Sequence, residues 1–125
     1  MVRMTAGTVL LAATVAASAL TQATYVRAAT KYDGAWSVVI YTRTGPCDAA
    51  YRFSGQITNG IITYTGGPVD FTGRVRSGGA AYVRVSSGSN YAVAHGRLAV
   101  RRGSGVWHGQ GPNGYCTGTW SATRA

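Results

Sequence analysis

The chain has 125 residues, of which 46% are hydrophobic, and it carries a formal net charge of +9 because 12 Lys and Arg residues face three Asp and Glu residues. This length fits one small domain. The three carboxylates, Asp33, Asp48 and Asp70, lie too far apart in the sequence to indicate the carboxylate pair of a glycosidase.

Residues 1–29 have the pattern of a secretory signal peptide. A short start that contains Arg3 precedes an uncharged run over residues 8–20, and small residues with cleavage sites of the Ala-x-Ala kind follow. The run is rich in alanine and threonine, whereas a membrane-spanning helix needs about 20 strongly apolar residues. A cleaved signal is therefore favoured over an uncleaved anchor. We expect cleavage after Ala28 or Ala29, one domain over residues 30–125, and a secreted or periplasmic location.

The exported part alternates short apolar and polar stretches with glycine-rich turns, and it has no helical period longer than one turn. The strands are expected at residues 36–42, 51–58, 61–65, 69–77, 81–87, 90–100, 105–109 and 116–123. Their short connections predict an antiparallel up-and-down meander. Eight such strands form a closed barrel or a sandwich, and closure removes the exposed edges that invite aggregation.

Two of the turns have strong sequence signals. Asn59-Gly60 is typical of a type I′ hairpin turn and sets Ile57 opposite Ile62. Gly88-Ser89 fits a type II′ turn. Both turns keep apolar residues on one face of the predicted sheet.

Glycines and large apolar residues recur two positions apart, which places them on the same face of a strand. The repeats are Gly34-Ala35-Trp36, Gly105-Val106-Trp107, Gly118-Thr119-Trp120, Phe53-Ser54-Gly55 and Phe71-Thr72-Gly73. We expect the three tryptophans, both phenylalanines and Tyr64 to face the interior together with Gly55, Gly73 and Gly118. An eight-stranded barrel is just wide enough to be filled by such side chains or to hold one small ligand.

The only two cysteines, Cys47 and Cys116, predict one disulfide. They do not fit a metal site, which needs more ligands, or a Cys-x-x-Cys redox pair. Cys116 opens the last predicted strand and Cys47 follows the first, so the bridge would join the two strands that close the barrel. Chain entropy gives such a loop roughly 4 kcal/mol at most.

The outer face of the central strands is basic. A three-residue loop at 78–80 would set Val75 opposite Val83, Arg74 opposite Arg84, and Arg76 opposite Tyr82. Arginines interleaved with an aromatic ring suit sugar rings and anionic groups. The candidate surface site is Arg74, Arg76, Tyr82, Arg84, His95 and Arg97. Codon usage in a GC-rich genome is the alternative origin of the basic excess.

No residues form a persuasive catalytic or cofactor site. His95 and His108 are predicted on outer faces, so neither is expected to bind a metal or haem. The serines lie in glycine-rich turns and lack the spacing of a nucleophile elbow. We expect no catalysis, no cofactor and no metal.

Four stretches of the exported part resemble a group of short secreted proteobacterial proteins of unknown role. The stretches are Tyr32-Asp33-Gly34-Ala35-Trp36-Ser37, Cys47-Asp48-Ala49-Ala50-Tyr51-Arg52, Ile57-Thr58-Asn59-Gly60 and Cys116-Thr117-Gly118-Thr119-Trp120. Some members carry a label of haem utilisation or adhesion, which the resemblance brings with it as an expectation.

A second resemblance covers three positions: Gly34, Trp36 and Arg124 are similar to residues of the lipocalin and avidin group of calyx-shaped barrels. It implies a barrel that holds a ligand, with the arginine packed across the tryptophan to close the bottom. Small secreted metalloprotease inhibitors of Gram-negative bacteria are also calyx barrels with one disulfide. Their disulfide closes a short loop, whereas Cys47 and Cys116 are far apart in this sequence.

Together these patterns predict a non-catalytic binding protein that takes a small or anionic ligand, a polysaccharide or an envelope component. The alternatives are a calyx-type protease inhibitor, a protein of haem utilisation or adhesion, and a purely structural envelope protein. Nucleic acid is not an expected partner because the chain carries an export signal, and the mature part has no apolar run long enough to cross a membrane as a helix.

Overall fold

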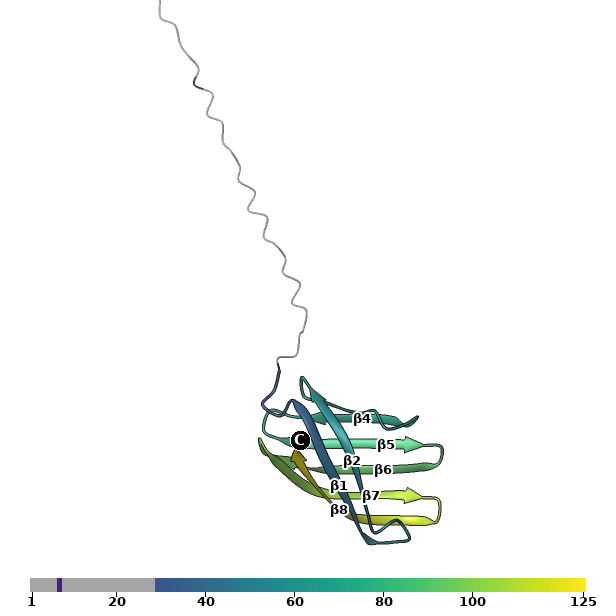
Figure 1. Cartoon of the computed structure of the whole chain (residues 1–125). Coiled ribbons are helices and arrows are strands. Elements are labelled where there is room, and N and C mark those ends of the chain that lie inside the picture. Colours follow the sequence, from purple (N-terminus) through teal and green to yellow (C-terminus); the bar gives the residue numbers. More distant parts are fainter. Residues whose placement is uncertain (1–6, 8–28) are drawn as a thin grey trace, which may run out of the picture.

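The computed structural model describes residue 7 and residues 29–125, and the latter form the barrel of strands in Figure 1. The predicted signal peptide lies almost wholly outside the described residues and stays a prediction. Within the described part of the chain, no helix has the length and apolar character needed to cross a membrane.

Eight antiparallel strands close into one barrel in sequence order, and β8 pairs back onto β1. The strands are β1 (Gly34–Thr44), β2 (Ala50–Thr58), β3 (Ile61–Tyr64), β4 (Asp70–Val75), β5 (Ala80–Ser87), β6 (Asn90–Leu98), β7 (Arg102–Gly111) and β8 (Gly114–Arg124). The predicted all-β, up-and-down barrel is confirmed. The strands β1, β7 and β8 are longer than expected because pairing continues through glycines that look like turn residues in the sequence.

Two hairpin turns follow their sequence signals and a third departs by one residue. Gly88, at φ 61°, and Ser89 form the predicted two-residue turn between the paired residues Ser87 and Asn90. Asn59 and Gly60 both have positive φ, 53° and 78°, and Ile57 pairs with Ile62 as predicted. Between β4 and β5 the three-residue loop is 77–79 rather than 78–80, because Gly79, at φ 93°, takes its last position.

That shift corrects the predicted register between β4 and β5. Val75 lies opposite Ala81, not Val83, and Gly73 lies opposite Val83. The pairing moves by two residues, so every side chain stays on the face predicted for it. The cross-strand neighbours on the outer face change, however, and this matters for the basic residues described below.

The tryptophans are buried as predicted, with 2%, 6% and 8% of Trp36, Trp107 and Trp120 exposed. The last two glycine–tryptophan motifs pair reciprocally: Trp107 lies opposite Gly118, and Trp120 lies opposite Gly105. The glycines leave room for the flat indoles. The Trp107 Nε1–H donates to the carbonyl oxygen of Tyr41 at 2.9 Å, beside a β-bulge in β1.

One end of the barrel, called here the closed end, is covered by the segment before β1 and by Arg124 near the end of β8. The Arg124 guanidinium lies 4.9 Å from the centre of the Trp36 ring and donates to the carbonyl oxygens of Lys31 and Val100 at 2.7 and 2.8 Å. Tyr32 is 3% exposed and accepts a hydrogen bond from the Trp36 indole at 2.8 Å. This is the arginine–tryptophan contact that the calyx resemblance implies.

Asp33 ties the closed end to the β2–β3 turn. Its carboxylate accepts hydrogen bonds from the Thr30 hydroxyl and from the backbone N–H groups of Asn59, at 2.8 Å, and Gly60, at 3.3 Å. These bonds, with Thr30 first, lower the pKa of Asp33 below its usual value, although desolvation acts in the opposite direction.

The predicted disulfide is present. The Cα atoms of Cys47 and Cys116 lie 6.3 Å apart, and Cys116 is fully buried on β8. Cys47 lies in the β1–β2 loop, so the bridge fastens that loop to β8 at the end of the barrel opposite the closed end, called here the open end.

Candidate ligand-binding site

The barrel is not filled by its side chains. Near the closed end lies a cavity of about 80 Å³, called here the deep cavity, whose accessible wall is wholly apolar. Its lining includes Trp36, Ile57, Leu98 and Trp120. An apolar cavity of this kind offers water no hydrogen-bond partner and stays dry.

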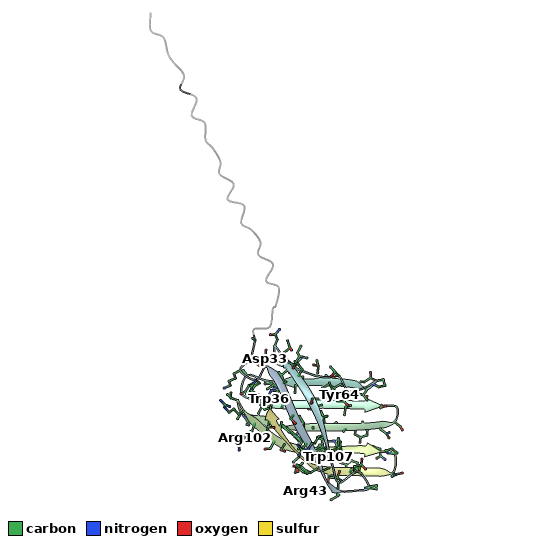
Figure 2. The ribbon with its side chains drawn as sticks, in the orientation of Figure 1. Asp33, Trp36, Arg43, Tyr64, Arg102 and Trp107 are labelled. Carbon is green, nitrogen blue, oxygen red and sulfur yellow. A yellow bond between two sulfur atoms is a disulfide. The ribbon has the colours of Figure 1, made fainter. Side chains whose placement is uncertain are left out.

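A second cavity of about 320 Å³, called here the mouth cavity, occupies the open end. The two cavities adjoin each other inside the barrel, because five residues line both: Ile40, Phe53, Phe71, Val83 and Ala94. Figure 2 shows Asp33 and Trp36 toward one end of the barrel and Tyr64 toward the other. The interior is therefore a calyx with a closed base and an apolar throat.

An aromatic cluster forms one wall of the mouth cavity. The ring of Tyr64 lies 5.7 Å from Phe53, edge to face, and 5.9 Å from Phe71. Only two residue pairs join β3 to β4, so the two strands separate toward the open end. The aromatic cluster lies where they separate. The open end thus gains a wall of three mutually inclined aromatic rings and loses part of its hydrogen-bonded wall.

Four of the residues that line the mouth cavity have polar side-chain groups. They are Tyr51 and Arg52 at the start of β2, Tyr64 on β3, and Trp107, whose indole N–H is bonded to Tyr41. Burial, with a smaller contribution from the charge of Asp48, raises the pKa of Tyr51 above its usual value, so its hydroxyl stays neutral. The mouth therefore offers the Tyr51 hydroxyl to a ligand whose body is apolar.

The lining of both cavities contains no Ser, Cys, His, Asp or Glu. His95 is exposed on β6, and His108 lies on β7 with its ring 6.3 Å from that of Tyr115. Among residue 7 and residues 29–125, no three His, Cys, Asp or Glu side chains gather to hold a metal ion.

The structure brings the six candidate surface residues together on the outer face of β4, β5 and β6, and all six are exposed. The neighbours predicted between β4 and β5 are wrong, whereas Tyr82 lies opposite His95 on β6 as predicted. Arg74 lies opposite Tyr82, Arg76 is bonded to Ala80, and Arg84 lies opposite Thr72. The repulsive Arg74–Arg84 pair expected from the sequence therefore does not form, because the loop is 77–79.

Part of the calyx wall escapes the sequence analysis. Ala92 and Ala94 on β6 face the interior, and both line the mouth cavity. Their spacing of two residues predicts only a strand. Their small size is the signal for a cavity, because two alanines on the inner face leave space when the residues across the barrel are large.

No family model matches the sequence, and no curated protein and no solved structure matches it. The candidate function therefore depends on the geometry of the barrel alone.

Proposed function

We propose that this protein binds a small apolar molecule inside its barrel and catalyses no reaction. The observation that carries the proposal is the apolar calyx formed by the two adjoining cavities, covered by Arg124 and Trp36 at one end and accessible at the other. The mouth cavity, at about 320 Å³, falls in the range of roughly 300–1,000 Å³ that is typical of ligand pockets.

The lining supports an aromatic or polyisoprenoid-like body for the ligand rather than a charged one. Burial of apolar area against Phe53, Phe71 and Val83 supplies the driving force, at about 25 cal/mol per Å². Phe53 and Tyr64 are suited to stacking against a planar group. A charged ligand body would meet no compensating group below Arg52 and would lose its hydration.

Two further observations support an exported binder over a protease inhibitor. An inhibitor that docks through residues before Trp36 needs a free arm, but Tyr32 is buried and Asp33 is bonded to the β2–β3 turn. The disulfide fits an oxidising compartment, which agrees with secretion or a periplasmic location.

The proposal is tested with N-phenyl-1-naphthylamine, a neutral aromatic probe that fluoresces in apolar surroundings. We expect saturable binding with one site per molecule. Ala94→Phe puts a ring into the space shared by both cavities and should abolish this binding. Val106→Phe adds a similar ring at a position on β7 that is 48% exposed, and it should leave binding unchanged.

Urea melts of each variant separate loss of the site from loss of the fold. If Ala94→Phe does not fold, Val83→Phe fills the same shared space and replaces it. Equal probe binding by the wild type and a folded cavity variant would overturn the proposal, as would an absence of binding by the wild type.

A further inference from the structure

The outer face carries a second arrangement that the calyx does not use, called here the basic strip: Arg74, Arg76, Ala80, Tyr82, His95 and Arg97. It has two rungs across three strands. In one rung Tyr82 on β5 lies between Arg74 on β4 and His95 on β6. In the other, Ala80 lies between Arg76 and Arg97.

The two rungs differ in shape. Tyr82 is 46% exposed, so much of its ring is available to solvent. Ala80 carries only a methyl group between the exposed Arg76 and Arg97. Arg97 donates to the carbonyl oxygen of Gly78 at 3.0 Å, which fixes its position beside the 77–79 loop.

The charge around the basic strip is not neutralised by the three carboxylates of the chain. Asp33 accepts hydrogen bonds at the β2–β3 turn. Asp48 lies in the β1–β2 loop, and Asp70 begins β4 at the open end. Arg101 and Arg102, in and after the β6–β7 loop, extend the positive surface toward the closed end, where Figure 2 labels Arg102.

We propose that the basic strip binds an acidic polysaccharide. The exposed ring of Tyr82 packs against the apolar face of a sugar, since an aromatic side chain presents a flat apolar surface with a polar tip. The arginines on either side bind carboxylate or sulfate groups on neighbouring sugars, and guanidinium matches such groups with paired hydrogen bonds.

A chain polymer fits this surface better than an anionic bilayer. The strip follows the convex flank of a barrel, and along each strand its positions two residues apart are separated by about 6.6–6.8 Å. A flexible chain can follow such a row. The strip contains no large aliphatic side chain that would insert between lipids, and Tyr82 lies within β5 rather than on a protruding loop.

This proposal does not depend on the calyx. The basic strip lies on the outer face and the cavities lie inside, so their ligands do not compete.

The test measures binding of polygalacturonate, a carboxylated polysaccharide, to the full exported chain at low ionic strength. Arg74→Ser/Arg76→Ser removes two charges from the strip. Arg43→Ser/Arg52→Ser removes two exposed charges near the open end and is the matched control. We expect the first variant to weaken binding about tenfold or more, which is the scale of one lost charge-assisted bond, and the control less than about threefold.

A second pair of variants tests sugar packing. Tyr82→Phe should retain binding and Tyr82→Ala should lose it by about fivefold or more, because only the former keeps the ring. Polyacrylate, which has carboxylates but no sugars, should not distinguish these two variants. The proposal is overturned if both double variants weaken binding equally, if Tyr82→Ala binds like the wild type, or if anionic phosphatidylglycerol vesicles bind and polygalacturonate does not.

Discussion

At the scale of single residues, the glycines on the inner face do two different things. A Cβ atom at Gly73 would lie 2.7 Å from the Cβ of Ile62 and 3.2 Å from the Phe71 ring. A Cβ atom at Gly55 would meet nothing nearer than the Thr63 carbonyl oxygen at 3.7 Å. The sequence presents both as the same Phe-x-Gly repeat, and only the packing of neighbouring strands distinguishes them.

This difference predicts opposite effects of the same substitution. Gly73→Ala should lower the free energy of unfolding by about 1–3 kcal/mol, because the new methyl group overpacks a tight contact. Gly55→Ala should be neutral or stabilise by about 0.4–1 kcal/mol, because it restricts the unfolded chain without strain. Arg84→Ala on the outer face should change stability by less than about 0.5 kcal/mol. Urea melts measure all three variants. Equal destabilisation by Gly73→Ala and Gly55→Ala would contradict the difference in packing between the two glycines.

Asp33 should make the stability of the closed end depend on pH. Its pKa is lowered in the folded state, so the charged form stabilises the fold. That contribution is complete above the unfolded pKa near 3.9 and is lost as pH falls through the lower folded value. Acid should therefore reduce the urea midpoint of the wild type more than that of Asp33→Asn.

The Thr30 hydroxyl is the largest cause of this shift. NMR titration of the Asp33 carboxyl should therefore give a higher midpoint in Thr30→Val than in the wild type. A midpoint that does not move would show that the hydroxyl does not stabilise the carboxylate.

At the scale of elements, the sequence predicts which face of the barrel wall a side chain occupies better than it predicts the residue opposite on the next strand. Alternation of apolar and polar residues places each strand's inner face correctly, because a shift by two residues preserves it. It does not determine which residue lies opposite which. The β4–β5 loop contains the consecutive glycines Gly78 and Gly79. From the sequence alone, either of them is able to adopt the positive φ that the last position of the loop requires. Contact with β6, where the Leu98 N–H donates to the Gly79 carbonyl oxygen, accompanies the observed choice.

The reciprocal motif of β7 and β8 predicts a specific cost for losing one indole N–H. Trp107→Phe keeps an aromatic ring but leaves the Tyr41 carbonyl oxygen without its donor at the β-bulge. We expect the free energy of unfolding to fall by about 1–3 kcal/mol. Tyr41→Phe, which removes an exposed hydroxyl nearby, should cost less than about 0.5 kcal/mol. Chemical denaturation compares them, and equal losses would mean that the indole bond contributes nothing.

At the scale of the whole molecule, the sequence predicts that the barrel is closed, but it does not predict that the interior contains cavities. Eight short strands, short turns and two well-placed cysteines predict the closed barrel and its disulfide. Whether the interior is full depends on a small difference between the barrel's volume and the summed volume of its side chains. The small side chains of Ala92 and Ala94 leave space in the mouth cavity, and only two residue pairs join β3 to β4. The alternation of apolar and polar residues predicts neither feature.

The calyx is the central claim, and the most direct measurement is the location of a bound probe. Intermolecular NOEs between N-phenyl-1-naphthylamine and the methyl groups of the folded protein report that location without any substitution. A probe in the calyx should give NOEs to Val83 and Ala94, which line both cavities. NOEs confined to Val93 and Val106, on the outer faces of β6 and β7, would contradict a ligand site inside the barrel.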